Sequence, residues 1–251
     1  MSISFLHLAP YLFLVSTFLQ ASPIKIGFSN DYEPVSFARH GKAVGISPDI
    51  VREAIGNELT VEFVSLPWVR AQRMVEEGKL DAMFSIATQA REVYSIPSAL
   101  PGFTGEFRGY TYIHHPQMER LSRVKRIEEI KDLVACEYLG SGWGNQHLKS
   151  VLQRIEFSPT LATKLEMTRW KRCDFIVELD FLVDYQNNRS SLDKLVKLPA
   201  VYQTVSFRLL LSKKSAYKEL LTVFDKNIVN LEKAGRVRSI IQSWVHARQG
   251  L

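Results

Sequence analysis

The stretch LPWVRAQRMVEEGKLDAMFSIATQAREVYSIP, residues 66–97, contains a helix pattern, a short apolar run and an arginine, in that order. The helix pattern ends at Gly78, because glycine readily adopts the left-handed backbone common at helix ends. The run AMFSI, residues 82–86, is typical of a strand buried on both faces of a parallel sheet. Three polar residues would emerge at the carboxyl edge of this strand, where open α/β sheets bind ligands: Ser85, Thr88 and Arg91. The stretch therefore predicts one half of a binding cleft.

The order strand, helix, strand, helix, strand occurs twice along the chain. The first copy is expected at residues 24–28, 47–56, 60–66, 68–77 and 82–86, with Ser47 as the helix cap and Gly56 at the helix end. The second copy is expected at residues 134–138, 145–153, 155–157, 160–169 and 175–179. This repetition predicts two similar α/β lobes.

Two extended segments are expected to cross between the lobes, at residues 108–113 and 207–211, and helices are expected at 217–234 and 237–246. A pair of crossings makes a hinge about which a cleft can close. The predicted fold is therefore α/β, with two Rossmann-like lobes joined by a two-strand hinge. The expected boundaries are 22–108 with 205–251 for lobe 1, and 109–204 for lobe 2.

Four motifs occur in a characteristic order within the opening stretch: Pro67-Trp68, Gly78-Lys79-Leu80-Asp81-Ala82, Thr88-Gln89-Ala90-Arg91-Glu92, and Pro97. In this order they resemble the extracytoplasmic solute-binding proteins of the polar amino acid type, bacterial family 3, which capture ligands for uptake systems. The resemblance extends more weakly from about Ile24 to the C-terminal helices. It implies a fold like that of the type II periplasmic binding proteins.

The resemblance implies that Arg91 holds a carboxylate of the ligand, which a guanidinium can grip with two hydrogen bonds. Ser85 and Thr88 would add contacts to the same anion. From the residues alone, Arg91 could instead form a surface ion pair with Glu92, and Thr88 could cap the following turn.

Aromatic residues and a glycine-rich segment complete the expected site. Tyr32 would cover one face of the ligand or pack within its own loop, whereas Phe37 is expected only to pack. Trp68 is expected only as a wall residue, because a tryptophan in an otherwise apolar context is more often part of the core. Ser141 lies in the segment GSGWGN, residues 140–145, which opens a helix whose free N–H groups suit an anion. The alternative for this segment is a turn without a ligand.

The resemblance also implies a carboxylate of the second lobe that meets the amino group of an amino acid. In that family, this acid lies just past the third strand of the second lobe, at a fixed distance after the aspartate that precedes the strand. Here that aspartate is Asp174, and the same distance reaches Leu179, which is not acidic. The chain therefore departs from the family pattern at this position. Glu178 and Asp180 flank that position and would share one face of the strand. Either residue could substitute by a small shift.

The first residues differ from the rest of the chain. Residues 8–19 are almost wholly apolar but too short to span a bilayer securely, and Ala21 offers a small residue for signal peptidase. This pattern predicts a signal peptide at residues 1–21 and a periplasmic protein. An uncleaved anchor remains the alternative, because no Lys or Arg precedes the apolar run.

The bulk composition is that of an ordinary globular protein, with 46% hydrophobic and 23% charged residues. The net charge of +6 is not concentrated in one region, so no nucleic-acid partner is expected. Cys136 and Cys173 could pair in an oxidising compartment or remain two buried thiols, and they are too few for a zinc site. No cofactor or metal is predicted.

The resemblance implies a monomeric binding protein that captures a small carboxylate-bearing ligand, with an amino acid as the expected ligand, for an ABC permease of the inner membrane. The main alternative is a sensory module for a membrane receptor. An enzyme of the dehydratase kind, which uses a similar fold, is the less favoured alternative because no motif for a nucleophile or a metal is present.

Overall fold

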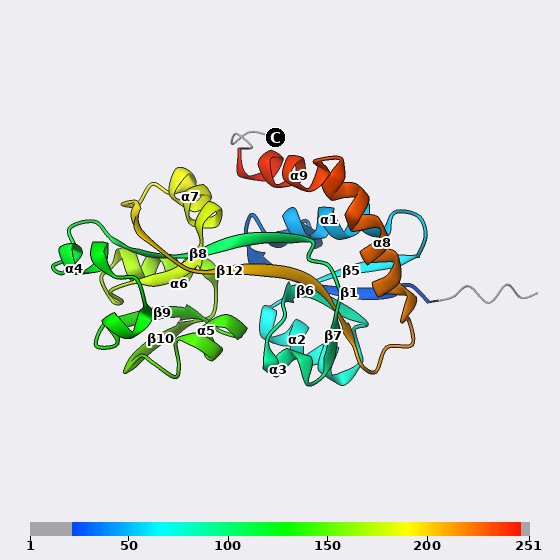
Figure 1. Cartoon of the computed structure of the whole chain (residues 1–251), viewed down its shortest axis with the longest axis horizontal. Coiled ribbons are helices and arrows are strands. Elements are labelled where there is room, and N and C mark those ends of the chain that lie inside the picture. Colours follow the sequence, from blue (N-terminus) through cyan, green and yellow to red (C-terminus); the bar gives the residue numbers. More distant parts are fainter. Residues whose placement is uncertain (1–21, 247–251) are drawn as a thin grey trace, which may run out of the picture.

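The computed structural model describes residues 22–246 and contains two α/β lobes joined by two long strands (Figure 1). These strands are β8, Phe103–Tyr112, and β12, Leu195–Ser212, and they pair antiparallel along most of their length. Strand β12 is much longer than the five-residue segment expected from the sequence, because its polar half pairs with β8 as far as the second lobe. The α/β fold with a two-strand hinge is confirmed. The expected lobe boundaries stay a prediction, since each strand continues from one lobe into the other.

Lobe 1 contains the first half of the described chain and the last two helices. Its strands are β1 (Ile24–Ser29), β2 (Asp31–Tyr32), β3 (Ser36–Arg39), β4 (Lys42–Val44), β5 (Val61–Leu66), β6 (Ala82–Ile86) and β7 (Ser95–Pro97). Its helices are α1 (Ile46–Ile55), α2 (Trp68–Glu77), α3 (Gln89–Glu92), α8 (Glu219–Lys233) and α9 (Arg236–Val245).

Lobe 2 contains the segment between the two crossing strands. Its strands are β9 (Val134–Tyr138), β10 (Arg154–Ser158) and β11 (Ile176–Leu179). Its helices are α4 (Met118–Arg123), the 3₁₀ helix η1 (Ile127–Ile130), α5 (Gly142–His147), α6 (Leu161–Arg169) and α7 (Asp180–Arg189). The predicted signal peptide, residues 1–21, lies outside the described residues.

One sheet runs through the hinge and connects the lobes, with the strand order β11-β8-β12-β6-β1-β5 and with β7 also paired to β12. Strands β1, β5 and β6 are parallel, as expected from helical connections, whereas β12 pairs antiparallel with β6 and β8. The carboxyl end of β6 therefore lies beside the crossing strands. Residues that follow this strand are held at the junction of the two lobes.

Two helices begin earlier than the sequence predicts. Helix α1 starts at Ile46 with Gly45 as its N-cap residue, so Ser47 lies inside the helix and does not cap it. The preceding loop takes the place of a side-chain cap at this helix start, because the Val35 carbonyl accepts from the N–H group of Ser47 at 2.8 Å. Helix α5 starts at Gly142 because the Ser141 hydroxyl caps it by accepting from the N–H group of Gly144 at 2.9 Å, and the helix ends at His147.

Helix α7 was not predicted at all. Asp180 was expected to share a strand face with Glu178, but the chain turns into a helix at Asp180. Its buried residues Leu182, Val183 and Asn187 repeat at helical spacing, and this repeat decides the local structure. Glu178 and Asp180 therefore do not share one face of a strand, which corrects that expectation.

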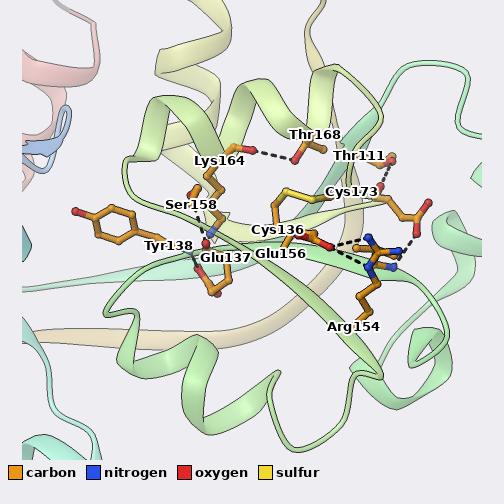
Figure 2. The surroundings of a disulfide bond; sticks show 12 residues. Thr111, Cys136, Glu137, Tyr138, Arg154, Glu156, Ser158, Lys164, Thr168 and Cys173 are labelled. Atoms are coloured by element: carbon orange, nitrogen blue, oxygen red, sulfur yellow. Dashed lines mark hydrogen bonds and ion pairs between the residues drawn. A yellow bond between two sulfur atoms is a disulfide. The ribbon is translucent and has the colours of Figure 1, made fainter. Parts of the chain in front are cut away.

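The two cysteines form a disulfide bond between β9 and the turn before β11 (Figure 2). The Cα atoms of Cys136 and Cys173 are 5.5 Å apart, and the bond closes a loop with a sequence separation of 37 residues. Both side chains are buried within lobe 2. Of the two alternatives left by the sequence, the structure contains the paired one.

Reduction of this disulfide should lower the free energy of unfolding by about 2–5 kcal/mol, because the open chain gains conformational entropy when unfolded. Urea unfolding with and without a phosphine reductant measures the difference. The chain has two cysteines, so no other bond responds to the reductant. A Cys136→Ser, Cys173→Ser variant that unfolds at the same urea concentration with and without reductant is the control. An unchanged midpoint for the wild-type protein would contradict the prediction.

Candidate functional site: a charged cavity between the lobes

A cavity lies where the lobes meet the crossing strands. The centres of water-sized spheres can occupy about 70 Å³ of it, which is room for roughly five water molecules or a small ligand. Its walls include side chains of both lobes and of the hinge strands. Six residues predicted from the sequence line it: Tyr32, Trp68, Ser85, Arg91, Ser141 and Glu178.

The structure does not bring two predicted residues into this cavity. Thr88 lies on the outer side of Arg91, in an open groove between α2, α3 and α5, and its hydroxyl makes no capping hydrogen bond. Asp180 begins helix α7, where its carboxylate accepts from the N–H group of Phe181 at 2.8 Å. Phe37 packs edge-on against Trp244, with ring centroids 5.7 Å apart, in agreement with its expected packing role.

Arg91 is buried, with 4% of its surface exposed, and its guanidinium is held by four hydrogen bonds. Nε donates to Gln72 at 3.0 Å, and Nη1 donates to the Ser85 hydroxyl at 2.9 Å and to the Ile86 carbonyl at 2.8 Å. The fourth bond joins Nη2 to the Gly140 carbonyl of lobe 2 at 3.1 Å. The guanidinium is thus fixed at the boundary between the lobes.

The charge of Arg91 has no carboxylate partner among residues 22–246, and Glu92 does not pair with it. Burial lowers the pKa of Arg91 to about 10, so the group stays charged at neutral pH. A buried cation without a counter-charge is costly, and a bound anion would offset that cost. The surroundings of Arg91 are therefore suited to a ligand carboxylate.

The Gly140 carbonyl accepts three hydrogen bonds from lobe 1. Besides Arg91 Nη2, the donors are Trp68 Nε1 and Gln72 Nε2, both at 3.1 Å. Gly140 has φ +82°, and a Cβ atom there would approach Gln72 Nε2 to 2.7 Å, so the contact requires glycine. This carbonyl joins the lobes across the cleft.

The lobes are also joined at the loop after β1, where three consecutive residues of lobe 1 each bind a side chain of lobe 2. Asp31 accepts from the Tyr138 hydroxyl at 2.6 Å, the Tyr32 hydroxyl donates to Glu178, and Glu33 accepts from the Tyr185 hydroxyl at 2.7 Å. The rings of Tyr32 and Tyr138 also stack, with centroids 6.2 Å apart. These bonds span the cleft, so the structure is a closed form of the two lobes.

Lobe 2 contains a buried cluster of three charged residues, Glu137, Lys164 and Glu178, which we call the charge triad. Lys164 Nζ donates to Glu137 at 2.8 Å and to Glu178 at 3.2 Å, and also to the Val177 carbonyl at 3.0 Å. Figure 2 shows Lys164 of α6 directed toward Glu137 of β9. All three side chains are almost completely buried, and both glutamates line the cavity.

Two carboxylates and one ammonium give the triad an excess of one negative charge when all three groups are ionised. Burial raises the pKa of Glu137, and repulsion from Glu178 adds to this effect against the pull of Lys164. For Lys164, burial works to lower the pKa, but attraction from both carboxylates outweighs it and the pKa is raised. The lysine therefore stays protonated, and one carboxylate charge remains to face the cavity.

Glu137 and Lys164 were not predicted as site residues, although the sequence carries a signal for both. Glu137 interrupts the apolar run Val134–Tyr138, and Lys164 lies between Leu161, Leu165 and Thr168 on the buried face of α6. A charged residue within an apolar strand or on the buried side of a helix requires a partner. Two such residues in one lobe indicate a buried ion pair.

Comparison with known proteins gives a family for part of the chain. Residues 24–98 match the model of bacterial extracellular solute-binding proteins, family 3. This match includes Arg91 and the strands on either side of it. No curated protein matches the chain at a significant level.

Solved structures match the whole fold at low sequence identity. A histidine kinase sensor domain similar to periplasmic binding proteins has 20% identity and a TM-score of 0.75, with 89% of this chain and 96% of that chain covered. The amino acid ABC transporter substrate-binding protein AbpA from Streptococcus pneumoniae, bound to L-arginine, has 18% identity and a TM-score of 0.72, with 89% and 94% covered.

An ancestral amino acid-binding protein, described as a precursor of cyclohexadienyl dehydratase, also shares the fold. It has 18% identity and a TM-score of 0.71, with 89% of this chain and 95% of that chain covered. At such identities the likeness is one of fold, and the family match lies in the first lobe. Residues 24–98 are thus similar to the bacterial extracellular solute-binding proteins, family 3, and the described chain has the fold of the type II periplasmic binding proteins.

Proposed function

We propose that the protein captures a zwitterionic amino acid between its lobes and delivers it to an ABC permease. The observation that carries this proposal is the opposition of charges across the cavity. Arg91 of lobe 1 offers a buried cation without a carboxylate partner among the described residues, and the charge triad of lobe 2 offers an excess negative charge. A ligand with one carboxylate and one ammonium would neutralise both.

Each end of the proposed ligand has further support. The ring of Trp68 lies against the guanidinium of Arg91, 5.2 Å from Cζ to the ring centroid, and keeps water from it. Tyr32 is held over the cavity by its hydrogen bond to Glu178. Because these groups come from both lobes, a bound ligand favours the closed form and lets a permease distinguish loaded from empty protein.

The proposed location is the periplasm. A disulfide persists in oxidising compartments such as this one, and the bond between Cys136 and Cys173 is consistent with export. No helix within residues 22–246 is long and apolar enough to cross a membrane. The processing of residues 1–21 is tested by N-terminal sequencing, which should find a mature chain that begins near Ser22.

A sensory role is the second candidate, because the fold is shared with a histidine kinase sensor domain and with the glutamate-binding core of GluR0. Transport and sensing use the same cleft but different partners. Deletion of the gene should abolish uptake of the labelled amino acid if the protein serves a permease, and should leave uptake intact if it serves a receptor. We propose binding without turnover, so the ligand should be recovered unchanged after long incubation.

The proposal is tested by the melting temperature of the purified protein with each of the twenty standard L-amino acids. A ligand at about 100 times its dissociation constant adds about 2.7 kcal/mol to the stability of the native state. The amino acid with the largest effect is then compared with its analogues that lack the amino group or the carboxylate. Both analogues should fail, and equal stabilisation by either would overturn the zwitterion site.

Lowering the pH from 7 to 5 should weaken binding of this amino acid. The pKa of Glu137 is raised above its ordinary value of 4.5, so the carboxylate takes up a proton at a higher pH than a free glutamate does. Protonation removes the excess negative charge, while Lys164 and Glu178 still face one another. Calorimetry at several pH values measures the loss, and Glu137→Gln should bind weakly with little pH dependence. A variant with the full wild-type dependence would assign the effect to another group.

Replacement of Tyr185 by phenylalanine should weaken binding through closure alone. The Tyr185 hydroxyl joins the lobes by its bond to Glu33 and does not line the cavity. Loss of one hydrogen bond of this kind costs about 0.5–1.5 kcal/mol, which corresponds to about a two- to tenfold weaker affinity. The variant and the wild type are then compared by small-angle scattering at ligand concentrations that occupy the same fraction of each protein. The variant should show the larger radius of gyration. Equal affinity and equal radius would show that this bond does not contribute to closure.

A further inference from the structure

The floor of the cavity is aromatic. Neighbouring strands β6, β12 and β8 each direct one phenylalanine to the cavity, namely Phe84, Phe207 and Phe107. The rings of Phe84 and Phe207 stack with centroids 6.4 Å apart, and Trp143 packs edge-on against Phe107 at 4.9 Å. These hinge-side rings present apolar surface to any ligand that lies between Arg91 and the charge triad.

The hydroxyl groups that line the cavity differ in whether they have partners. Ser85 accepts from Arg91 at 2.9 Å, Ser36 donates to the Ser29 carbonyl at 2.7 Å, and Ser29 donates to Asp31 at 2.9 Å. Ser47 is the exception among the described residues that line the cavity. It is 1% exposed, and its Oγ has no hydrogen-bond partner.

The backbone around Ser47 is held in place by the preceding loop. Gly45 and the bond from the Ser47 N–H group to Val35 fix the start of α1 against the loop before it. A buried hydroxyl without a partner costs about 1–3 kcal/mol. A ligand that supplies the missing partner would recover part of that free energy.

We propose that the ligand is an uncharged amino acid whose side chain lies on the aromatic floor and carries one hydrogen-bonding group that meets Ser47 Oγ. This inference rests on the proposed zwitterion site, because it assigns Arg91 and the triad to the two charged groups of the ligand backbone. The ionisable side chains that line the cavity are then all used or hydrogen-bonded, and a charged ligand side chain would find no counter-charge. The cavity therefore excludes lysine, arginine, aspartate and glutamate.

The experiment compares calorimetric affinities within pairs of amino acids of nearly equal shape: threonine with valine, serine with alanine, and tyrosine with phenylalanine. In the pair that binds best, the hydroxyl-bearing member should bind at least about fivefold tighter, because one hydrogen bond contributes about 1 kcal/mol. In Ser47→Ala this preference should fall below about twofold. Ser65→Ala is the matched control, since Ser65 Oγ is also buried without a partner but lies outside the cavity.

The outcomes separate this inference from the function on which it rests. If no amino acid binds, the proposed function fails. If a charged amino acid binds best and needs Arg91, the zwitterion site stands and the assignment of an uncharged ligand is overturned. If Ser47→Ala folds with the wild-type melting temperature and keeps the full preference for the hydroxyl, the role of Ser47 is overturned.

Discussion

Replacement of Lys164 by methionine should lower the free energy of unfolding by about 3–5 kcal/mol, because it leaves two buried carboxylates without a cation. Lys164 and Glu137 are 1% and 3% exposed in their side chains, so water cannot take the place of the ammonium. Urea unfolding at neutral pH measures the loss. Lys226→Met is the matched control, since Lys226 is 64% exposed and pairs with Glu58 at the surface. Its loss should be under about 1 kcal/mol.

A triple variant distinguishes lost charge balance from lost packing. Lys164→Met combined with Glu137→Gln and Glu178→Gln contains no charge in the triad, so it should recover a measurable part of the stability lost by Lys164→Met alone. The recovery should shrink as the pH is lowered, because protonation of the carboxylates achieves the same neutralisation in the single variant. A loss under 1 kcal/mol for Lys164→Met would contradict the buried charge triad. A triple variant less stable than the single one would show that the carboxylates stabilise the lobe without their cation.

Replacement of Arg91 by methionine should weaken binding of the amino acid found by thermal shift by at least about thirtyfold. The proposed contact joins a buried guanidinium to a ligand carboxylate, and truncation of one partner of such a pair costs about 2–5 kcal/mol. Calorimetry measures the affinity directly. Arg73→Ala is the control, since Arg73 lies on the exposed face of α2, with 77% of its side chain accessible, and should change the affinity by less than about twofold.

Arg91 also joins the lobes through the Gly140 carbonyl, so closure has to be separated from ligand contact. Gln72→Ala removes a donor to the same carbonyl and the Gln72 contact to Arg91, but leaves the guanidinium in place. Its effect on affinity should be well below that of Arg91→Met. Equal losses for the two variants would assign the role of Arg91 to closure, and a loss under fivefold for Arg91→Met would remove it from the site.

The sequence predicted the fold, and the lobe 1 residues that line the candidate cavity, because their signals are local. Residues 82–86 form β6 with the expected bounds, and Gly78 adopts the left-handed backbone expected at the end of α2. Arg91 follows β6 by a few residues, so its position at the edge of the sheet depends on one strand and one turn. The family motifs lie in this same region and strengthened each of these predictions.

The charge triad of lobe 2 could not be predicted in the same way because it depends on packing between distant elements. Glu137 and Glu178 meet through Lys164, which comes from a third element between them. The sequence left Glu178 and Asp180 as alternatives for a local reason, since it did not indicate that helix α7 begins at Asp180, where that carboxylate accepts from the Phe181 N–H group. The orphan hydroxyl of Ser47 depends on the loop that binds its N–H group, which the sequence does not indicate.

The most direct test of the zwitterion site is a crystal structure of the protein with the amino acid that most raises its melting temperature. We expect the ligand carboxylate within hydrogen-bond distance of the Arg91 guanidinium, and the ligand ammonium within hydrogen-bond distance of Glu137 or Glu178, with both lobes closed on it. A ligand held by one lobe only, or with its ammonium away from both glutamates, would contradict the proposed site.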